Sequence, residues 1–227
     1  MRPMSGRLST PHGDVSAKLL RDDRSRALLV LAHGAGAGMR HAFMESLAKA
    51  LLENGVATYR FQFPYTEAEK FRPDPPRVLE GVVRAAVAQA AALAPDLPSF
   101  AGGKSMGGRM TSSAVAHGGL PGVRALVFFG FPLHPAKKPA VTRAAHLAEV
   151  LLPMLFLQGE RDDLADLPLL RPIVEGLAPR AQLHVVPEAN HGFEVPKRTG
   201  RTHQDVIEEL AARAAEFMRR HAPTNEK

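Results

Sequence analysis

The chain has 227 residues, and its 45% hydrophobic and 23% charged content is that of one ordinary soluble globular domain. It has no cysteine, which excludes a disulfide framework, a thiolate nucleophile and a cysteine-based metal site. No stretch of about 18 consecutive apolar residues occurs, and the N-terminus lacks the apolar core of a signal peptide. We therefore expect a cytoplasmic protein that does not enter a membrane.

The formal net charge of +6 comes from 29 lysines and arginines against 23 acidic residues. A nucleic-acid partner requires that such charge gather on one patch beside a recognition motif. The basic residues here are scattered along the sequence, and no zinc-finger or RNA-recognition motif occurs. The absence of tryptophan leaves few rings for base stacking. The sequence therefore does not favour a nucleic-acid partner.

Short apolar runs alternate with longer segments of helical period, which is the pattern of a parallel sheet with crossover helices. Strands are predicted at Ala27–Ala32, Val56–Phe61, Ser99–Gly103, Arg124–Phe129, Pro153–Gln158 and Leu183–Val186. Helices are predicted over residues 43–52, 78–86, 106–116, 167–177 and 206–218, and proline-bearing loops over 62–77 and 131–139. Residues 1–227 are expected to form a single α/β domain, with mobile ends at about residues 1–12 and 223–227.

In an open α/β sheet the site lies where the strands end, so the residues after each strand are of most interest. The segment GGKSMGG ends the strand predicted at Ser99–Gly103 and matches G-x-S-x-G between a strand and a helix. A nucleophile on so tight a turn is lifted clear of the sheet, and residues two positions away must lack side chains, as Gly103 and Gly107 do. The helix that follows also favours developing negative charge at its N-terminus. Ser105 is therefore the predicted nucleophile.

The same segment also resembles the end of a phosphate-binding loop, G-x-x-x-x-G-K-[ST]. That motif requires a glycine at position 98, where this chain has Pro98. A loop over residues 98–105 would also remove the strand predicted there, and no later strand ends in an aspartate placed for Mg²⁺. The sequence therefore does not favour a nucleotide-binding site.

A second glycine-rich segment, HGAGAG, begins at His33 directly after the first predicted strand. In enzymes whose nucleophile lies on a strand–helix turn, the oxyanion is held by two backbone N–H groups. One follows the nucleophile and the other comes from an early strand–helix loop. The first donor is predicted to be Met106 and the second Ala35, with Gly36 beside it. His33 is interpreted as a structural residue that forms a hydrogen bond within its loop.

A serine hydroxyl needs a base to take its proton, and the base needs a carboxylate to orient it. For a nucleophile on this kind of turn the chain order is serine, acid, histidine. His191 follows the last predicted strand and is the predicted base. The acid comes from the loop after PMLFLQ, where Asp162 and Asp163 are adjacent and position alone leaves both open. These acidic residues lack the spacing of a Ca²⁺ loop, and no H-E-x-x-H occurs, so no metal is expected.

Together, the segments HGAGAG, GGKSMGG, GERDD and NHGF resemble those of the α/β-hydrolase superfamily, close to small cap-less members of the dienelactone-hydrolase type. The resemblance runs from about Ala27 to His221. It implies an α/β-hydrolase fold with a mostly parallel central sheet, helices on both faces and no large cap domain. The segment Gly130–Pro139 is similar to a subfamily that includes a subunit of a chromatin-acetylating complex and a testis-expressed protein of animals.

The resemblance further implies a triad of Ser105, His191 and Asp162 that hydrolyses a carboxylic ester or related small acyl substrate and needs no cofactor. Dienelactone hydrolases proper use a cysteine nucleophile, so their substrate is not carried over to this chain. The alternative function is a non-catalytic interaction scaffold that retains the fold. A pure scaffold has no reason to keep a complete triad in the right order.

The walls of the substrate pocket are expected where loops leave the sheet near these residues. They are predicted to be Gly36, Phe63, Tyr65, Phe131, Leu133, His134 and Phe193. A further hypothesis is a basic ring at the mouth that attracts anionic substrates. Its members would be Arg40, Lys137, Lys138, Arg143, Lys197, Arg198 and Arg201. The simpler interpretation is that these are ordinary solvated charges. No oligomeric state is predicted.

Overall fold

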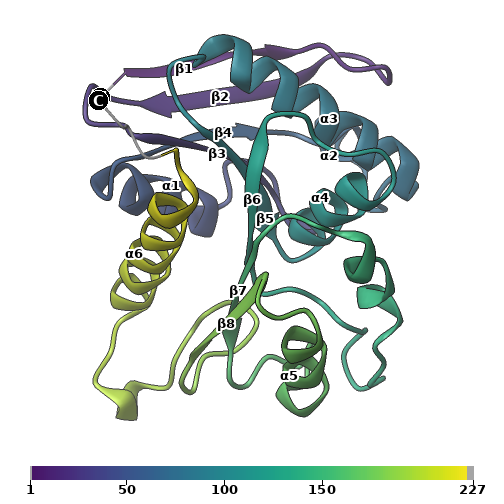
Figure 1. Ribbon diagram of the computed structural model, residues 1–227, viewed down its shortest axis with the longest axis vertical. Coiled ribbons are helices and arrows are strands. Elements are labelled where there is room, and N and C mark those ends of the chain that lie inside the picture. The colour runs from purple at the N-terminus through teal and green to yellow at the C-terminus, as the bar shows by residue number, and fades with distance from the viewer. Residues whose placement is uncertain (1, 224–227) are drawn as a thin grey trace.

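The computed structural model describes residues 2–223 as one eight-stranded sheet with helices packed against both faces (Figure 1). The strands span Arg2–Leu8 (β1), Val15–Arg21 (β2), Ala27–Ala32 (β3), Val56–Phe61 (β4), Ser99–Lys104 (β5), Val123–Phe129 (β6), Met154–Gly159 (β7) and Ala181–Val186 (β8). Across the sheet their order is β1-β2-β4-β3-β5-β6-β7-β8. The pairs β1–β2 and β2–β4 are antiparallel, and every other neighbouring pair is parallel.

The helices that join these strands form two layers. They span Ala42–Glu53 (α1), Pro64–Glu67 (α2), Pro76–Leu93 (α3), Met106–Ala116 (α4), Leu167–Gly176 (α5) and His203–His221 (α6), with 3₁₀ helices at Thr142–Glu149 (η1) and Lys197–Thr199 (η2). Helices α1 and α6 pack together on one face of the sheet, and α3, α4 and α5 cover the other (Figure 1). The prediction of a mostly parallel sheet with helices on both faces is therefore confirmed.

The central strands are buried along their whole length because helices cover both of their faces. All residues of β3, β4 and β7 are buried. In β3, Leu28 and Val30 contribute to the core beneath α3 and α4, whereas Leu29 and Leu31 contribute to the core beneath α1 and α6. A strand buried on both faces needs an uninterrupted apolar run, which is the pattern from which these strands were predicted.

The N-terminal segment differs from the expectation of a mobile end. Residues Arg2–Leu8 form β1, which pairs along its whole length with β2 at the edge of the sheet. This edge strand is held by backbone hydrogen bonds, and of residues 4–8 only Leu8 is buried. Because burial of its side chains is not required, the segment shows no apolar run. For this reason β1 was not predicted, and β2 was not predicted either. At the other end, the expected mobile residues 224–227 lie outside the described part of the chain.

The connections add short helices that the sequence did not indicate. The predicted loop over residues 62–77 contains α2, and the segment between β6 and β7 contains η1. Within residues 2–223 no separate cap domain is inserted above the sheet. No helix of this described part is long and apolar enough to cross a membrane.

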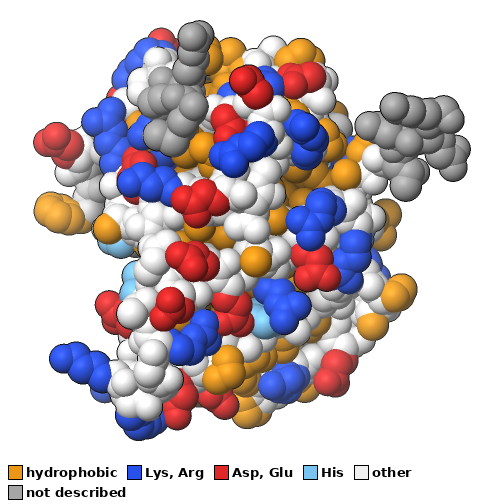
Figure 2. All heavy atoms as spheres, turned by 90° about the vertical axis from the view of Figure 1, so that its left-hand side faces the viewer, with side chains coloured by type: hydrophobic (Ala, Val, Ile, Leu, Met, Phe, Trp, Pro, Cys, Tyr) orange, Lys and Arg blue, Asp and Glu red, His pale blue; other side chains and the backbone are white. Residues whose placement is uncertain are grey.

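Basic and acidic side chains are intermixed on the face formed by α1 and α6, which Figure 2 shows. Several are paired, for example Lys18 with Glu45 and Arg220 with Glu216. The positive net charge is therefore not gathered into a patch of one sign on this face.

Candidate active site

Three polar side chains meet at the end of the sheet where the parallel strands terminate. Ser105 directly follows β5, Asp162 lies in the loop after β7, and His191 lies in the loop after β8. Because β5, β6, β7 and β8 are parallel and adjacent, their carboxyl ends lie along one edge. The structure thus brings together the serine, the histidine and one of the two aspartates that the sequence singled out.

Ser105 occupies a strained turn between β5 and α4. Its backbone angles are φ 52° and ψ −119°, which a non-glycine residue rarely adopts. The turn is tight because backbone packs directly on backbone at the flanking glycines. A Cβ at Gly103 would lie 2.5 Å from the carbonyl oxygen of Ala32, and a Cβ at Gly107 would collide with that same oxygen. Glycine at positions 103 and 107 therefore allows the close backbone contacts that this turn requires.

A continuous chain of hydrogen bonds joins the three side chains. The Oγ of Ser105 lies 2.9 Å from Nε2 of His191, and Nδ1 of His191 lies 2.7 Å from Oδ2 of Asp162. The imidazole remains 22% exposed, whereas the carboxylate of Asp162 is fully buried. With Nδ1 donating to the carboxylate, Nε2 faces the hydroxyl as an acceptor.

The surroundings of Asp162 distinguish it from its neighbour. The amide Nε2 of buried Gln158 donates to Oδ2 at 2.5 Å, and the N–H of Leu164 donates to Oδ1 at 2.9 Å. These bonds satisfy the buried carboxylate and fix its orientation toward His191. Asp163 is exposed, so the structure assigns the contact with the imidazole to Asp162.

The two N–H groups that the sequence put forward as oxyanion donors belong to residues of the segments that carry or contact Ser105. Met106 is the first residue of α4, and Ala35 follows Gly34 in the loop after β3. A Cβ at Gly34 would be 3.5 Å from Cβ of Ser105, so this loop packs directly beside the serine. Within residues 2–223, neither N–H donates a hydrogen bond to another protein group. Both are therefore free to bind an oxygen atom of a ligand.

A cavity of about 480 Å³ opens next to Ser105. It runs between the loop after β3, the start of α1 and the loop after β8. Its walls include Ala35, Gly36, Phe43, Met44, His191 and Glu194. Both apolar and polar groups line it, and Ser105 is accessible from it. Among the described residues, no group of three or more histidine, aspartate or glutamate side chains is arranged to hold a metal ion.

Six of the seven predicted wall residues lie in the interior rather than on this cavity, and only Gly36 lines it. The six buried residues are Phe63, Tyr65, Phe131, Leu133, His134 and Phe193. They follow strands as expected, but their side chains are buried in the core where the sheet ends. Phe63 packs edge-on against His33, and Phe131 packs edge-on against Phe128.

The walls come instead from the loops after β3 and β8, from the start of α1 and from His203 at the start of α6. Phe43 and Met44 belong to the apolar stripe that the sequence assigned to the core. A stripe at helical spacing does not indicate which of its members reaches the edge of the sheet. Neither residue type nor periodicity therefore identified them as wall residues.

His33 is structural, as the sequence indicated. Its Nδ1 lies 2.9 Å from the carbonyl oxygen of Gly34, and its Nε2 accepts the N–H of Phe63 at 3.1 Å. Burial lowers the pKa of His33 to about 4, so the ring is neutral near pH 7. Both ring nitrogens are occupied by backbone groups, and neither is available to a substrate.

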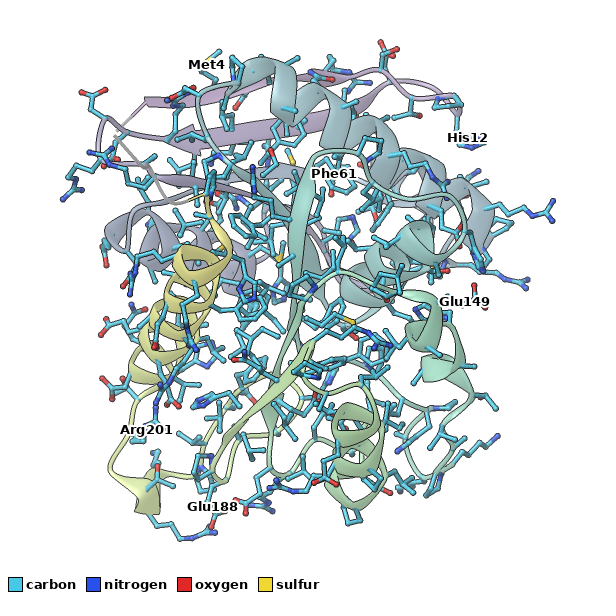
Figure 3. The ribbon with its side chains drawn as sticks, in the orientation of Figure 1. Met4, His12, Phe61, Glu149, Glu188 and Arg201 are labelled. Atoms are coloured by element: carbon cyan, nitrogen blue, oxygen red, sulfur yellow. The ribbon has the colours of Figure 1, made fainter. Side chains whose placement is uncertain are left out.

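The hypothetical basic ring is not assembled around the cavity, since none of its seven members lines it. Arg198 pairs with Glu188 at 2.7 Å, and Arg201 pairs with Glu209. Figure 3 labels Glu188 and Arg201 on the segments that connect β8 with α6. The charges of Arg198 and Arg201 are thus paired locally with carboxylates, and the absence of all seven residues from the cavity lining agrees with the simpler interpretation of solvated surface charge.

Lys104 is a residue of the site that the sequence analysis did not identify. It precedes Ser105, lines the same cavity, and donates a hydrogen bond from Nζ to the backbone carbonyl of His191 at 2.6 Å. The available signal was a lysine inside an otherwise apolar strand end next to the nucleophile. This lysine was considered only as part of the rejected phosphate-loop motif, whereas the structure turns it toward the loop of His191.

A model of the family described as alpha/beta hydrolase domain matches residues 25–219. Among solved structures, a dienelactone hydrolase from Anabaena variabilis is 20% identical, with a TM-score of 0.77 over 98% of this chain and 99% of that chain. A serine hydrolase without a lid from Xanthomonas campestris is also 20% identical, with a TM-score of 0.75 over 99% and 97%. An esterase from Pyrococcus furiosus is 17% identical, with a TM-score of 0.75 over 98% and 94%. At these identities the structures support the fold alone.

Proposed function

The chain belongs to the alpha/beta hydrolase domain family, and from that premise we propose that it is a serine hydrolase. In this proposal it cleaves a carboxylic ester or a related small acyl substrate through an acyl-enzyme on Ser105. His191 acts as the general base and acid, and Asp162 orients it. The observation that carries the proposal is the continuous hydrogen-bond chain from Oγ of Ser105 through the imidazole to a fully buried carboxylate.

Acylation begins when Oγ of Ser105 attacks the substrate carbonyl carbon and its proton passes to Nε2 of His191. The 2.9 Å separation of these two atoms allows direct transfer. The carboxylate of Asp162 stabilises the imidazolium that forms. The bond from the carbonyl carbon to the leaving oxygen then breaks, and that oxygen takes the proton from His191. An alcohol leaves, and the acyl group stays on Ser105.

Deacylation repeats these steps with water. The water oxygen bonds to the acyl carbon while His191 takes a proton from it. The bond to Oγ then breaks, Ser105 regains its proton from His191, and a carboxylic acid is released. In both steps the negative oxygen is held by the N–H groups of Met106 and Ala35, which no other protein group in the described range occupies.

The cavity of about 480 Å³ favours a small-molecule substrate, and we propose a cytoplasmic enzyme without a cofactor. The segment Gly130–Pro139 supports kinship with the subfamily that contains the chromatin-complex subunit and the testis-expressed protein. A scaffold function in the manner of an interaction protein is the alternative to catalysis. It predicts no reactive serine.

The test is labelling with a fluorophosphonate, followed by mass spectrometry of the labelled peptide. We expect the label on Ser105, and we expect Ser105→Ala to lose both labelling and hydrolysis of p-nitrophenyl acetate. Ser5→Ala is the matched control, because Ser5 is exposed on β1, far from the cavity in sequence and structure. Equal labelling of wild type and Ser105→Ala would overturn the proposal.

A further inference from the structure

The side chain of Lys104 runs from the end of β5 into the loop that carries His191. Its ammonium lies beside two stacked rings whose centres are 5.8 Å apart, 5.7 Å from the ring centre of Phe43 on α1 and 5.3 Å from that of Phe193. Cations are attracted to the faces of aromatic rings at such distances. The two rings and the strand therefore define one position for the ammonium.

At that position the ammonium donates to the backbone carbonyl oxygen of His191 at 2.6 Å. The bond is short and has a charged donor, a type about twice as strong as a neutral hydrogen bond. The residue whose carbonyl is held is the same one whose imidazole contacts Ser105 and Asp162. The contact thus ties the backbone of the proposed base to the strand that carries the nucleophile.

Gly130, at the end of β6, gives these groups the space to converge. Its φ of 71° suits glycine, and the point where a Cβ would stand is shared by three side chains. Nζ of Lys104 lies 3.0 Å from that point, Cε1 of His191 3.4 Å and Oδ2 of Asp162 3.5 Å. The ammonium is therefore close to the carboxylate and to the edge of the imidazole.

The charges around this point are few. Asp162 faces Lys104 from the loop after β7, and α1 presents the uncharged ring of Phe43. His41, Glu194 and His203 line the same cavity. Burial lowers the pKa of Lys104 to about 8, and Asp162 opposes part of that shift. The ammonium is therefore largely protonated at pH 7 and loses its proton within an accessible range.

We propose that the protonated Lys104 is a positioning residue, which fixes the His191 backbone so that the imidazole spans Ser105 and Asp162. This inference rests on the proposed function of the site. It assigns to the lysine a role through His191 and not a contact with substrate. It also predicts that the charge matters, because a neutral amine is a weaker donor to the carbonyl than an ammonium.

The first test compares Lys104→Met, Lys104→Arg and the control Lys49→Met, using p-nitrophenyl acetate between pH 6 and pH 10. Methionine keeps an unbranched apolar stem beside the rings but removes the donor, and Lys49 is exposed on the outer side of α1. We expect Lys104→Met to lower kcat about tenfold or more with little change in KM. Wild type and Lys49→Met should lose kcat above about pH 8. Lys104→Arg should keep its kcat to higher pH, since a guanidinium stays protonated.

The second test does not depend on activity. The His191 carbonyl carbon, labelled with ¹³C, is followed by NMR over the same pH range. We expect its resonance to titrate near pH 8 in wild type and Lys49→Met and to stay constant in Lys104→Met. If wild type neither hydrolyses esters nor reacts with fluorophosphonate, the proposed function fails while this carbonyl titration still tests the contact.

Two results would overturn the positioning role. One is a Lys104→Met variant that has wild-type kcat and the same loss of activity above pH 8. The other is a wild-type His191 carbonyl that does not titrate. Should Lys104→Met fail to fold, the wild-type carbonyl titration and the pH profile of Lys104→Arg decide the question.

Discussion

Two loops at the edge where the parallel strands end each carry a histidine, and the two imidazoles have different roles. His33, after β3, is fully buried, and both of its ring nitrogens bind backbone groups of Gly34 and Phe63. His191, after β8, is partly exposed, and its nitrogens face a serine hydroxyl and a buried carboxylate. One ring holds two loops together, and the other is open to a ligand.

The contrast between these two rings shows that the partners of an imidazole decide its role. A ring whose nitrogens are bound by backbone groups contributes to stability and has no free position for a proton from a substrate. A ring between a hydroxyl and a carboxylate can take a proton and return it. Substitutions in the two loops should therefore separate activity from stability.

The largest effect is expected at His191. Within residues 2–223, Nε2 of His191 is the one proton acceptor within hydrogen-bond distance of Oγ of Ser105. The substitution His191→Gln removes this acceptor. We expect kcat/KM for p-nitrophenyl acetate to fall by about 10⁴-fold or more, as for loss of other serine-hydrolase bases. The melting temperature should change little. A variant that retains a tenth of wild-type activity would show that another base operates.

The next effect concerns the carboxylate behind His191. Asp162→Asn removes the charge that orients the imidazole, and we expect a loss of up to about 10⁴-fold in kcat. Asp163→Asn is the matched control, because its side chain is exposed and makes no recorded contact with the ring. We expect it to stay within about twofold of wild type. If steady-state kinetics show that Asp163→Asn is the crippled variant, the assignment of the acid is wrong.

The turn that carries Ser105 and the central strands could be predicted because their physical requirements depend on the types of residue within each segment. Gly103 and Gly107 are dictated by backbone contacts with Ala32, and the run Ala27–Ala32 is dictated by burial on both faces. Asp162 could be separated from Asp163 only through the resemblance to the hydrolase superfamily, since its burial and its bond from Gln158 depend on the tertiary structure.

The remaining features are set by contacts between distant segments. Strand β1 is held by pairing with β2, and its exposed side chains carry no apolar pattern. The pocket walls depend on which residues of α1 reach the sheet edge, so Phe63 and Phe131 were wrongly assigned to them. Lys104 acquires its position only when β5 meets the loop of His191.

We expect His33 to affect the pH dependence of the free energy of unfolding and not the rate of ester hydrolysis. Its pKa is lowered to about 4 by burial, against about 6.5 for an exposed histidine. Its neutral ring is thus favoured in the folded state. The unfolded state binds more protons between these two values, so the stability that depends on neutral His33 is present above pH 6.5. It is lost as the pH falls toward 4, by about 3 kcal/mol in total.

The measurement is urea unfolding of wild type and His33→Gln at several values from pH 4 to pH 7.5. His146 also has its pKa lowered to about 4, by burial and by Arg109, so it contributes to the same window in both proteins. The difference in unfolding free energy between the two proteins isolates His33. We expect that difference to shrink as the pH falls. A constant difference across the range would mean that His33 is not held neutral in the folded protein.

The smallest effect is expected from the basic side chains that flank the loop of His191. Arg198 and Arg201 are paired with Glu188 and Glu209, and neither lines the cavity. Surface ion pairs are screened by salt and steer ligands little when each charge is compensated by its partner. We therefore expect Arg198→Ala to change kcat/KM less than about twofold. The comparison is between a neutral ester and a matched ester with a distal carboxylate, at low and at high salt. A preference of wild type for the anionic ester that disappears in Arg198→Ala or in high salt would show that this loop attracts the substrate as well as holding the base.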